Sequence, residues 1–304
     1  MSSPGSERQK GPGEALMLTT SFPRFAGDFA GHFVLRTAEW MAYDQWRVTV
    51  LTPPGRYAPP GMQRECYFTC PGILDGPGGP ECLEAQPRTA FFAGVITSIF
   101  MLISTLLRAY HVNLLVAHWL LPCGFVACVA GRLFKRPVHL FAHGGDIALL
   151  ERCPRWLRTS IAKFLDGQAH CISFVSENLK ERFRACLNED VQSVLLVRPM
   201  GIDEHRPDHA YAGALKTTLG GVQVIASVGR LVHIKGLDLI PKALQHMPDV
   251  VWCVAGDGPE RSTLEKLCQQ RGVNVHFLGS VTAAQRDALL SIAHCFVAPS
   301  RVVK

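Results

Sequence analysis

The sequence predicts an α/β protein made of two doubly wound domains, and three observations lead to that prediction. Short apolar, β-branched segments alternate with segments of helical spacing, as in parallel sheets covered by helices. The alternation restarts after the stretch 203–221, which contains Pro207 and the adjacent glycines Gly220 and Gly221. The length of 304 residues suits two domains of ~150 residues each. We therefore expect a disordered leader at 1–13, a first domain at 14–200 and a second at 201–304.

Composition and charge narrow the classes of function. Apolar residues make up 48% of the chain, which suits a packed core and excludes a disordered chain. Lys and Arg number 31 against 25 Asp and Glu, a net charge of +6 that favours phosphates or an anionic membrane surface without demanding nucleic acid. The 11 cysteines lack zinc-ligand spacing, so we expect reduced, buried thiols of a cytosolic protein and no bound metal. The N-terminus has no apolar core region, so no signal peptide is expected.

The first domain shows the alternation in order along the chain. Helices are indicated by apolar residues at helical spacing, as at Phe29, Phe33 and Trp40, and again near 122–134, 147–166 and 176–187. Pro and Gly are frequent over 53–88, which predicts a long surface loop. The strands are expected at 15–20, 46–51, 113–117, 137–142, 169–175 and 191–197.

One apolar stretch, 89–107, runs for 19 residues without a charge. Its length allows a transmembrane helix, but a span would separate two halves of one sheet. The remaining interpretations are a core helix and a helix that docks on a membrane surface. We expect the core helix and keep the other two as alternatives.

The second domain repeats the pattern in a shorter form. Helices are expected from Leu237 to Met247, from Pro259 onward, and from a capping box formed by Thr282 and Gln285. No helix follows the last strand, and a strand buried on both faces needs one. We therefore expect this domain to be incomplete. Its strands are predicted at 222–228, 250–255, 274–278 and 295–298.

A glycine-bounded turn, Gly229 to Gly236, lies between a strand and an expected helix. Arg230 and Lys235 are five residues apart on it and can converge on one ligand. The helix N-terminus would add its dipole and free N–H groups. This combination indicates a diphosphate site; the alternative is two solvated cations on a loop.

A second glycine turn, Gly256-Asp257-Gly258, also follows a strand. It departs from the GxGxxG pattern because Arg261 stands at the last glycine position, which disfavours a nicotinamide site. These glycines let the backbone approach a ligand or simply turn.

In the first domain, polar residues stand where strands end, which is where open α/β sheets bind ligands. His118 ends one strand, and His143 and Asp146 follow another. His143 could donate to a substrate hydroxyl or phosphate, or these residues could be structural. A glycine loop from Gly27 to Gly31 follows the first strand and serves either a ligand or a turn.

Together, and in this order, the motifs resemble those of family 4 glycosyltransferases. The resemblance covers about 15–304, and the order of the motifs is more specific than any one of them. It is carried by TTSFPRFAGDFAGHF at 19–33, AHWLLPCG at 117–124, AHGGD at 142–146, RPMGID at 198–203, GR-x4-KG at 229–236, AGDGPE at 255–260, FLG at 277–279 and VAPS at 297–300.

The resemblance implies the GT-B fold of two Rossmann-like domains, a retaining transfer from a nucleotide-diphosphate sugar in a cleft between domains, and no obligatory metal. Arg230 and Lys235 would stabilise charge on the leaving diphosphate, and His143 would contact the transferred sugar. His118 and Asp146 would lie on the acceptor side. The residues implied to bind the donor are Gly27, Gly31, Gly229, Gly256, Gly258, Phe277, Leu278, Gly279 and Val281.

The sequence departs from this family after Ser300, where an acidic Glu-x7-Glu motif is expected and only RVVK follows. We therefore expect little transfer activity from these 304 residues. The main hypothesis is a glycosyltransferase of cell-envelope or exopolysaccharide synthesis, peripheral at the inner face of the membrane, with a glycan or lipid-linked acceptor. The alternatives are a non-catalytic nucleotide-sugar-binding remnant of the fold and another GT-B chemistry such as a nucleotide-sugar epimerase.

Overall fold

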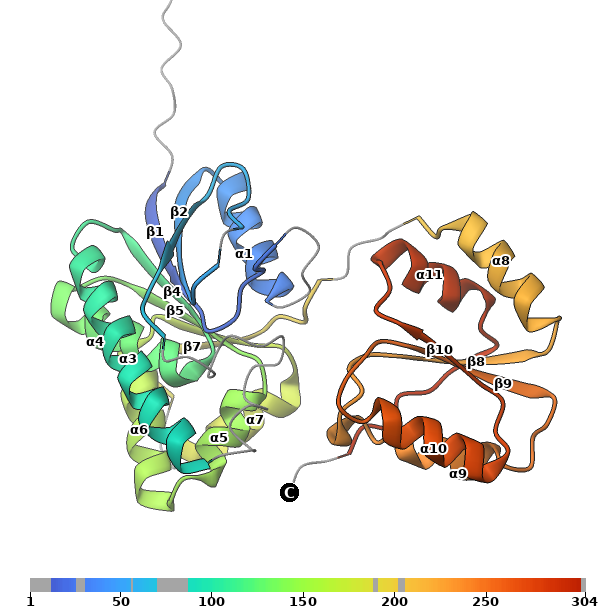
Figure 1. Cartoon of the computed structure of the whole chain (residues 1–304). Coiled ribbons are helices and arrows are strands. Elements are labelled where there is room, and N and C mark those ends of the chain that lie inside the picture. The colour runs from blue at the N-terminus through green and yellow to red at the C-terminus, as the bar shows by residue number, and fades with distance from the viewer. Residues whose placement is uncertain are drawn as a thin grey trace, which may run out of the picture. The chain divides into compact units, whose positions relative to one another are not determined.

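The computed structural model describes residues 12–25, 31–55, 57–69, 87–187, 191–201 and 206–301, with the backbone alone described at 87–91. The chain divides into two compact units, Met1–Gly201 and Ile202–Lys304 (Figure 1). Most of the expected leader at 1–13 lies outside the described residues.

The first unit is built on a seven-stranded parallel sheet in the order β3-β2-β1-β4-β5-β6-β7. Alternate side chains of its central strands enter separate cores on the two faces, Met17 on one and Leu16 and Leu18 on the other. The strands are β1 (Gly13–Leu18), β2 (Trp46–Thr52), β3 (Gln63–Cys66), β4 (Leu114–His118), β5 (Val138–Ala142), β6 (Cys171–Phe174) and β7 (Val194–Val197).

Helices cover both faces of this sheet, as a parallel sheet requires. The helix α1 (His32–Tyr43) packs in the core that contains Met17. The opposite face is covered by α3 (Pro87–Ala109), α4 (Phe125–Phe134), α5 (Gly145–Arg152), α6 (Arg155–Gln168) and α7 (Glu177–Leu187), with the π-helical turn η2 (Leu120–Gly124) leading into α4 (Figure 1).

Two expectations for the loops and helix boundaries of this unit were wrong. The stretch 53–88 is not one loop, because β3 pairs with β2 there; its sequence, QREC, lacks the apolar pattern of a buried strand because it lies at the sheet edge. The single helix expected over 147–166 is two helices, α5 and α6. The break falls at Cys153, where the following Pro154 disfavours helical backbone.

The apolar stretch forms α3, but the expectation of a core helix was wrong. Only 22% of its window Phe92–Ala109 is buried, although the mean hydropathy of 1.8 is high enough for a membrane span. A span would divide the sheet, since β1 before the helix pairs directly with β4 after it. The helix therefore lies along the unit with one apolar face exposed.

The second unit has a four-stranded parallel sheet in the order β10-β9-β8-β11. Its strands are β8 (Gln223–Val228), β9 (Val250–Ala255), β10 (Val275–Gly279) and β11 (Cys295–Phe296). One core lies under α8 (His209–Leu219) and α11 (Ala283–Ile292), and the other under α9 (Ile240–Leu244) and α10 (Arg261–Arg271).

In this unit one helix was not predicted and one expectation was wrong. The stretch 203–221 contains α8, which Asp208 caps by accepting a hydrogen bond from the Tyr211 N–H. The helix expected from Leu237 to Met247 is replaced by the 3₁₀ turn η4 (Leu237–Leu239) and the five-residue α9, and another 3₁₀ turn, η3 (His233–Lys235), precedes them. The capping box of Thr282 and Gln285 at the start of α11 is confirmed.

Candidate functional site

In each unit the strand order reverses next to its first strand, between β1 and β4 and between β8 and β11. Open α/β sheets bind ligands at such a reversal, beside the carboxyl ends of the strands. The site residues predicted from the sequence belong to the parts of the chain near these two edges. Gly27 is the exception, because it lies outside the described residues.

In the second unit, three loops at the carboxyl edge touch through glycines. Gly229 donates its N–H to Ala255 O at 2.9 Å, and Gly256 donates to Gly279 O at 2.7 Å. A Cβ on Gly256 would stand 1.9 Å from Gly229 O, and its φ is +131°. The loops after β8, β9 and β10 are therefore held together backbone to backbone, which only glycine allows at position 256.

The same contact continues one turn further. Leu231 N–H donates to Asp257 O at 2.9 Å, and Leu231 O accepts from Glu260 N–H at 3.0 Å. A Cβ on Gly258 would lie 2.4 Å from that carbonyl. Gly258 thus serves close packing between loops, which leaves its predicted contact with a donor untested.

Arg230 and Lys235 lie on the loop after β8, and both are exposed. The expected helix N-terminus beside them is wrong, because the 3₁₀ turns η3 and η4 stand in its place. The loop offers two cations at the strand reversal, without the dipole of a long helix behind them.

This loop is fixed by a residue that the sequence analysis did not single out. Arg301 forms a two-pronged ion pair with Asp238 at 2.7 and 2.6 Å and donates to His233 O at 2.7 Å. Its own N–H donates to Ile234 O at 2.8 Å. The Arg301 guanidinium lowers the pKa of the Asp238 carboxyl. Because 63 residues separate Asp238 from Arg301, no local pattern could have predicted the pair.

The donor-binding residues that the resemblance implies on and after β10 divide between two faces. Phe277 packs in the core beneath α9 and α10, with its ring 5.6 Å from the Arg261 guanidinium. Leu278 and Val281 pack in the core beneath α8 and α11. Since successive strand residues point to opposite faces, the structure does not bring these side chains to one surface; Gly279 remains at the loop contact.

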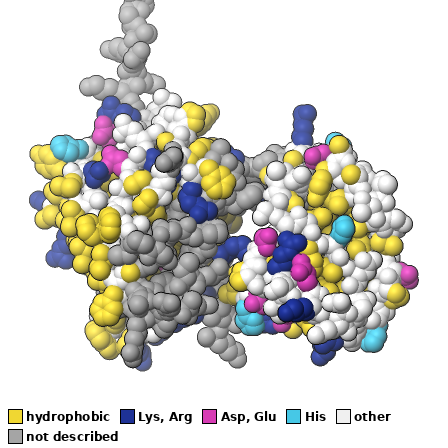
Figure 2. Space-filling model, in the orientation of Figure 1, with side chains coloured by type: hydrophobic (Ala, Val, Ile, Leu, Met, Phe, Trp, Pro, Cys, Tyr) yellow, Lys and Arg dark blue, Asp and Glu magenta, His cyan; other side chains and the backbone are white. Residues whose placement is uncertain are grey.

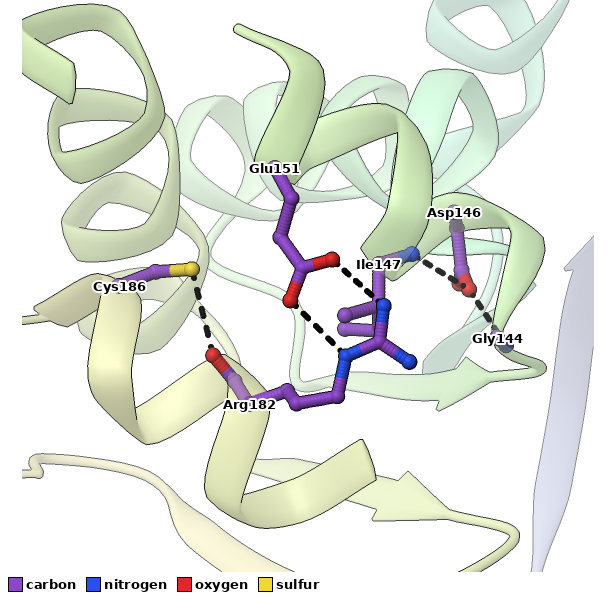
Figure 3. A network of polar contacts seen from close by, with 6 residues as sticks. All are labelled: Gly144, Asp146, Ile147, Glu151, Arg182 and Cys186. Carbon is purple, nitrogen blue, oxygen red and sulfur yellow. Dashed lines mark hydrogen bonds and ion pairs between the residues drawn. The ribbon is translucent and has the colours of Figure 1, made fainter. Parts of the chain in front are cut away.

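In the first unit, Asp146 is a buried hub with 3% of its surface exposed. Its carboxylate accepts from the backbone N–H groups of Gly144 at 2.8 Å and Ile147 at 3.0 Å (Figure 3). It also accepts from the N–H groups of Leu120 at 2.8 Å and His143 at 3.2 Å. It thereby joins the loop after β4 to the loop after β5. Burial raises its pKa, and these hydrogen bonds oppose the rise.

A second polar contact secures α5, the helix that carries Asp146. Glu151 near its end binds Arg182 of α7 through two hydrogen bonds of 2.9 and 2.5 Å (Figure 3). Cys186, one turn further along α7, donates its thiol to Arg182 O at 3.3 Å. The helix that positions the hub is therefore anchored at both ends.

His118 and His143 are brought together at this edge. The Nδ1 of His118 lies 2.9 Å from the Nε2 of His143, and the two ring planes are within 10° of parallel with their centroids 5.1 Å apart. Burial lowers the pKa of His118 well below its usual value, and burial lowers that of His143 to about 4. Both rings are therefore neutral near pH 7, and His143 is not a cation there.

The neutral pair has two tautomeric arrangements, and they differ in free energy because they leave a different kind of atom without a hydrogen-bond partner. The Nε2 of His118 is buried and has no hydrogen-bond partner among the described residues. A buried N–H without a partner is rarer in proteins than an acceptor without one, so His118 carries its proton on Nδ1 and donates to His143. His143 must then carry its own proton on Nδ1, which makes that nitrogen a donor.

Two aromatic residues complete this cluster and were not predicted as site residues. The ring of Phe33 lies 4.4 Å from that of His143, and Trp119 lies 4.8 Å from the same ring. Phe33 comes from α1, whose N-cap is Gly31. At Gly31 φ is +65°, and a Cβ there would stand 2.2 Å from Ser21 O. Gly31 thus allows α1 to begin close to the loop after β1.

Among the described residues, no group of three or more His, Cys, Asp or Glu side chains could hold a metal ion. The nine cysteines within the described ranges are free thiols.

The fold and these edges define a class, the two-domain Rossmann-like proteins with the GT-B fold. Two family models match: the glycosyl transferase 4-like domain over residues 30–200 and glycosyl transferases group 1 over residues 216–302. The chain belongs to the family 4-like glycosyltransferases.

Curated relatives agree with this assignment. A GDP-mannose-dependent alpha-(1-6)-phosphatidylinositol monomannoside mannosyltransferase of Mycolicibacterium smegmatis is 25% identical over 59% of this chain and 48% of its own length. TuaC of Bacillus subtilis, a glycosyltransferase assigned to teichuronic acid biosynthesis, is 31% identical over 79% of this chain and 57% of its own. The chain thus spans about half the length of these two relatives.

Solved structures share the fold at low sequence identity. Anabaena HepE in complex with UDP superposes with a TM-score of 0.68 at 16% identity, covering 96% of this chain and 75% of that one. Sucrose-phosphate synthase from Thermosynechococcus elongatus gives 0.68 at 17% identity, covering 94% and 75%.

The loop contact at Gly256 predicts a sharp difference between two glycines. Gly256→Ala should lower the free energy of unfolding of the second unit by more than about 2 kcal/mol, since backbone must move to admit the Cβ. Gly213→Ala, in α8 with nothing within 4 Å of the added Cβ, should be neutral or raise it by up to about 1 kcal/mol. Urea unfolding measures both, and equal effects would contradict the contact.

The Asp146 hub predicts intolerance of an amide. Asp146→Asn replaces one acceptor oxygen by an N–H₂ that must face a backbone donor, so unfolding should become easier by about 2–3 kcal/mol. Asp44→Asn, at an exposed position after α1, is the matched control. Urea titration at pH 7 measures the free energy of unfolding of both variants. Equal values would show that the hydrogen bonds of Asp146 do not stabilise the fold.

The buried histidines predict acid sensitivity of the first unit. The pKa values of His139 and His143 are lowered to about 4, so between pH 6.5 and 4 the unfolded chain binds protons that the folded chain does not. Stability should therefore fall as the pH drops through this window, by about 2 kcal/mol per histidine at pH 5. Removing one of the two groups by His143→Gln should reduce the slope of unfolding free energy against pH; an unchanged slope would contradict its neutral state.

Proposed function

We propose that this chain provides the body of a retaining glycosyltransferase that moves a sugar from a nucleotide-diphosphate sugar to a glycan or lipid-linked acceptor. The observation that carries the proposal is the glycine-joined loop edge of the second unit, with Arg230 and Lys235 exposed at its strand reversal. The close backbone contacts fix this loop edge, and two exposed cations on it favour a diphosphate.

The roles of the two cations follow from the charge of the reaction. When the bond between the anomeric carbon and the phosphate oxygen breaks, negative charge develops on the leaving nucleoside diphosphate. Arg230 and Lys235 would stabilise that charge without a metal ion. The ion pair of Arg301 and Asp238 would hold the loop in place, so that the two side chains need little rearrangement.

In the first unit, His143 would bind the transferred sugar as a neutral hydrogen-bond donor. Its Nε2 is occupied by His118 at 2.9 Å, so Nδ1 is the nitrogen left to meet a hydroxyl group. The rings of Phe33 and Trp119 lie against the ring of His143. Asp146 would act through the backbone, by fixing the loop that carries His143.

The donor and the acceptor class rest on relatives. The M. smegmatis relative is named for a GDP-mannose donor and a phosphatidylinositol mannoside acceptor, and a human relative, 30% identical over 42% of this chain, is a phosphatidylinositol N-acetylglucosaminyltransferase subunit. Anabaena HepE was solved with UDP and with UDP-glucose. We propose a role in cell-envelope or exopolysaccharide synthesis, at the inner face of the membrane.

Binding of UDP, GDP and ADP to the full chain tests the donor site by calorimetry. Arg230→Ala and Lys235→Ala should each weaken all three nucleotides by about tenfold or more, because each removes one charged contact to the diphosphate. The preference among bases should not change. Lys242→Ala removes an exposed cation from α9 and should leave affinity unaltered. Equal behaviour of the three variants would overturn the site.

A further inference from the structure

The segment that runs from α3 through α6 carries the whole positive excess of the chain. From Pro87 to Gln168 there are nine Lys and Arg against three Asp and Glu, an excess of six that equals the net charge of +6 of all 304 residues. Asp146 and Asp166 are buried, and Glu151 is bound to Arg182. These three acidic side chains therefore do little to offset the cations of this segment, among which Arg108 is paired with Glu65 of β3.

The helix α3 adds an apolar face to the layer of helices that this segment forms. One stripe of it is buried against the unit through Thr97, Met101 and Thr105. The opposite stripe is exposed, with Phe92 at 68%, Ile99 at 50% and Leu107 at 71% of their surfaces. Figure 2 shows hydrophobic side chains gathered on the side of the unit where Figure 1 places α3 and α4. The other members of the exposed stripe are Val95, Ile96, Phe100 and Ile103.

Basic and aromatic side chains gather at one end of this layer. The helix α3 packs against α4, and α4 against α6. Helices that connect parallel strands run opposite to them, so the N-terminal ends of all three lie at the carboxyl edge of the sheet. Arg155 and Trp156, which is 71% exposed, begin α6 there. Exposed Arg152 stands just before them, at the end of α5.

The positive charge of this face favours an anionic bilayer over a second copy of the chain as its partner. A second copy would bring two layers with an excess of six positive charges each against one another, which like-charge repulsion opposes. An anionic bilayer attracts the same cations and accepts apolar and tryptophan side chains at its interface.

We propose that the layer of α3, α4 and α6 docks on an anionic phospholipid bilayer, with the exposed stripe of α3 in the interfacial region and Arg152, Arg155 and Trp156 among the headgroups. This proposal deepens the membrane-surface part of the proposed function. It does not require donor binding or transfer, so the two can fail separately.

Co-sedimentation of the full chain with vesicles tests the proposal. Vesicles of phosphatidylcholine with one third phosphatidylserine should bind the chain about tenfold or more tightly than phosphatidylcholine alone, and salt should reduce the difference. UDP affinity, measured in parallel without vesicles, reports on the donor site alone.

Variants separate the apolar and the basic contributions. Ile99→Glu with Ile103→Glu should weaken binding to both vesicles by about tenfold or more, because charge replaces apolar surface. Arg152→Glu with Arg155→Glu should abolish the preference for anionic vesicles. Trp40→Glu with Tyr43→Glu changes exposed aromatics on α1, on the other face of the sheet, and should bind as the parent does.

Three results would overturn the proposal. The parent chain could bind neither vesicle, the α1 variant could lose as much binding as the α3 variant, or the chain could form a dimer in light scattering that Ile99→Glu with Ile103→Glu dissociates without any vesicle binding. The last result would assign the face to a second copy.

Discussion

Backbone groups at the carboxyl ends of parallel strands must find partners outside the sheet, and the candidate site of each unit depends on how they do so. The first unit uses a buried carboxylate: Asp146 collects N–H groups from the loops after β4 and β5. The second unit uses glycines, which let Gly229 and Gly256 meet without side chains between them. Both solutions fix the loop backbone before any ligand is present, which lowers the ordering cost of binding.

The sequence predicted those parts of the fold that depend on local patterns. Apolar runs such as those of β4 and β9 and the capping box of Thr282 are local signals, and the structure has them where they were expected. The errors have local causes too. The edge strand β3 has no apolar face that a sequence pattern could reveal. Pro154 ends one helix although the apolar spacing continues past it, so α5 and α6 were predicted as one. The helix α8 was not predicted because Gly220 and Gly221 follow it directly.

The glycine positions of the candidate site could be predicted from the sequence, but most contacts between its loops could not. Gly256 and Gly258 were chosen as residues that a ligand could approach, and their close contacts with Gly229 and Leu231 became visible only in three dimensions. Arg301 and Asp238 belong to different loops, so their pairing depends on the sheet order. Phe33 and His143 meet because α1 begins at Gly31 beside the loop after β1.

Positive charge has two uses in this chain, and the presence or absence of a fixed acceptor separates them. The Arg64 guanidinium donates hydrogen bonds to Thr52, Pro23 and Tyr57. Arg182 and Arg301 each bind a carboxylate. These cations are structural, because their donors are directed at fixed acceptors within the same unit. Arg155 and Lys235 are exposed instead, at the carboxyl edges of their sheets. Since an exposed cation acts on whatever anion reaches it, lipid headgroups and diphosphates are the ligands to which the surface charge of this chain is suited.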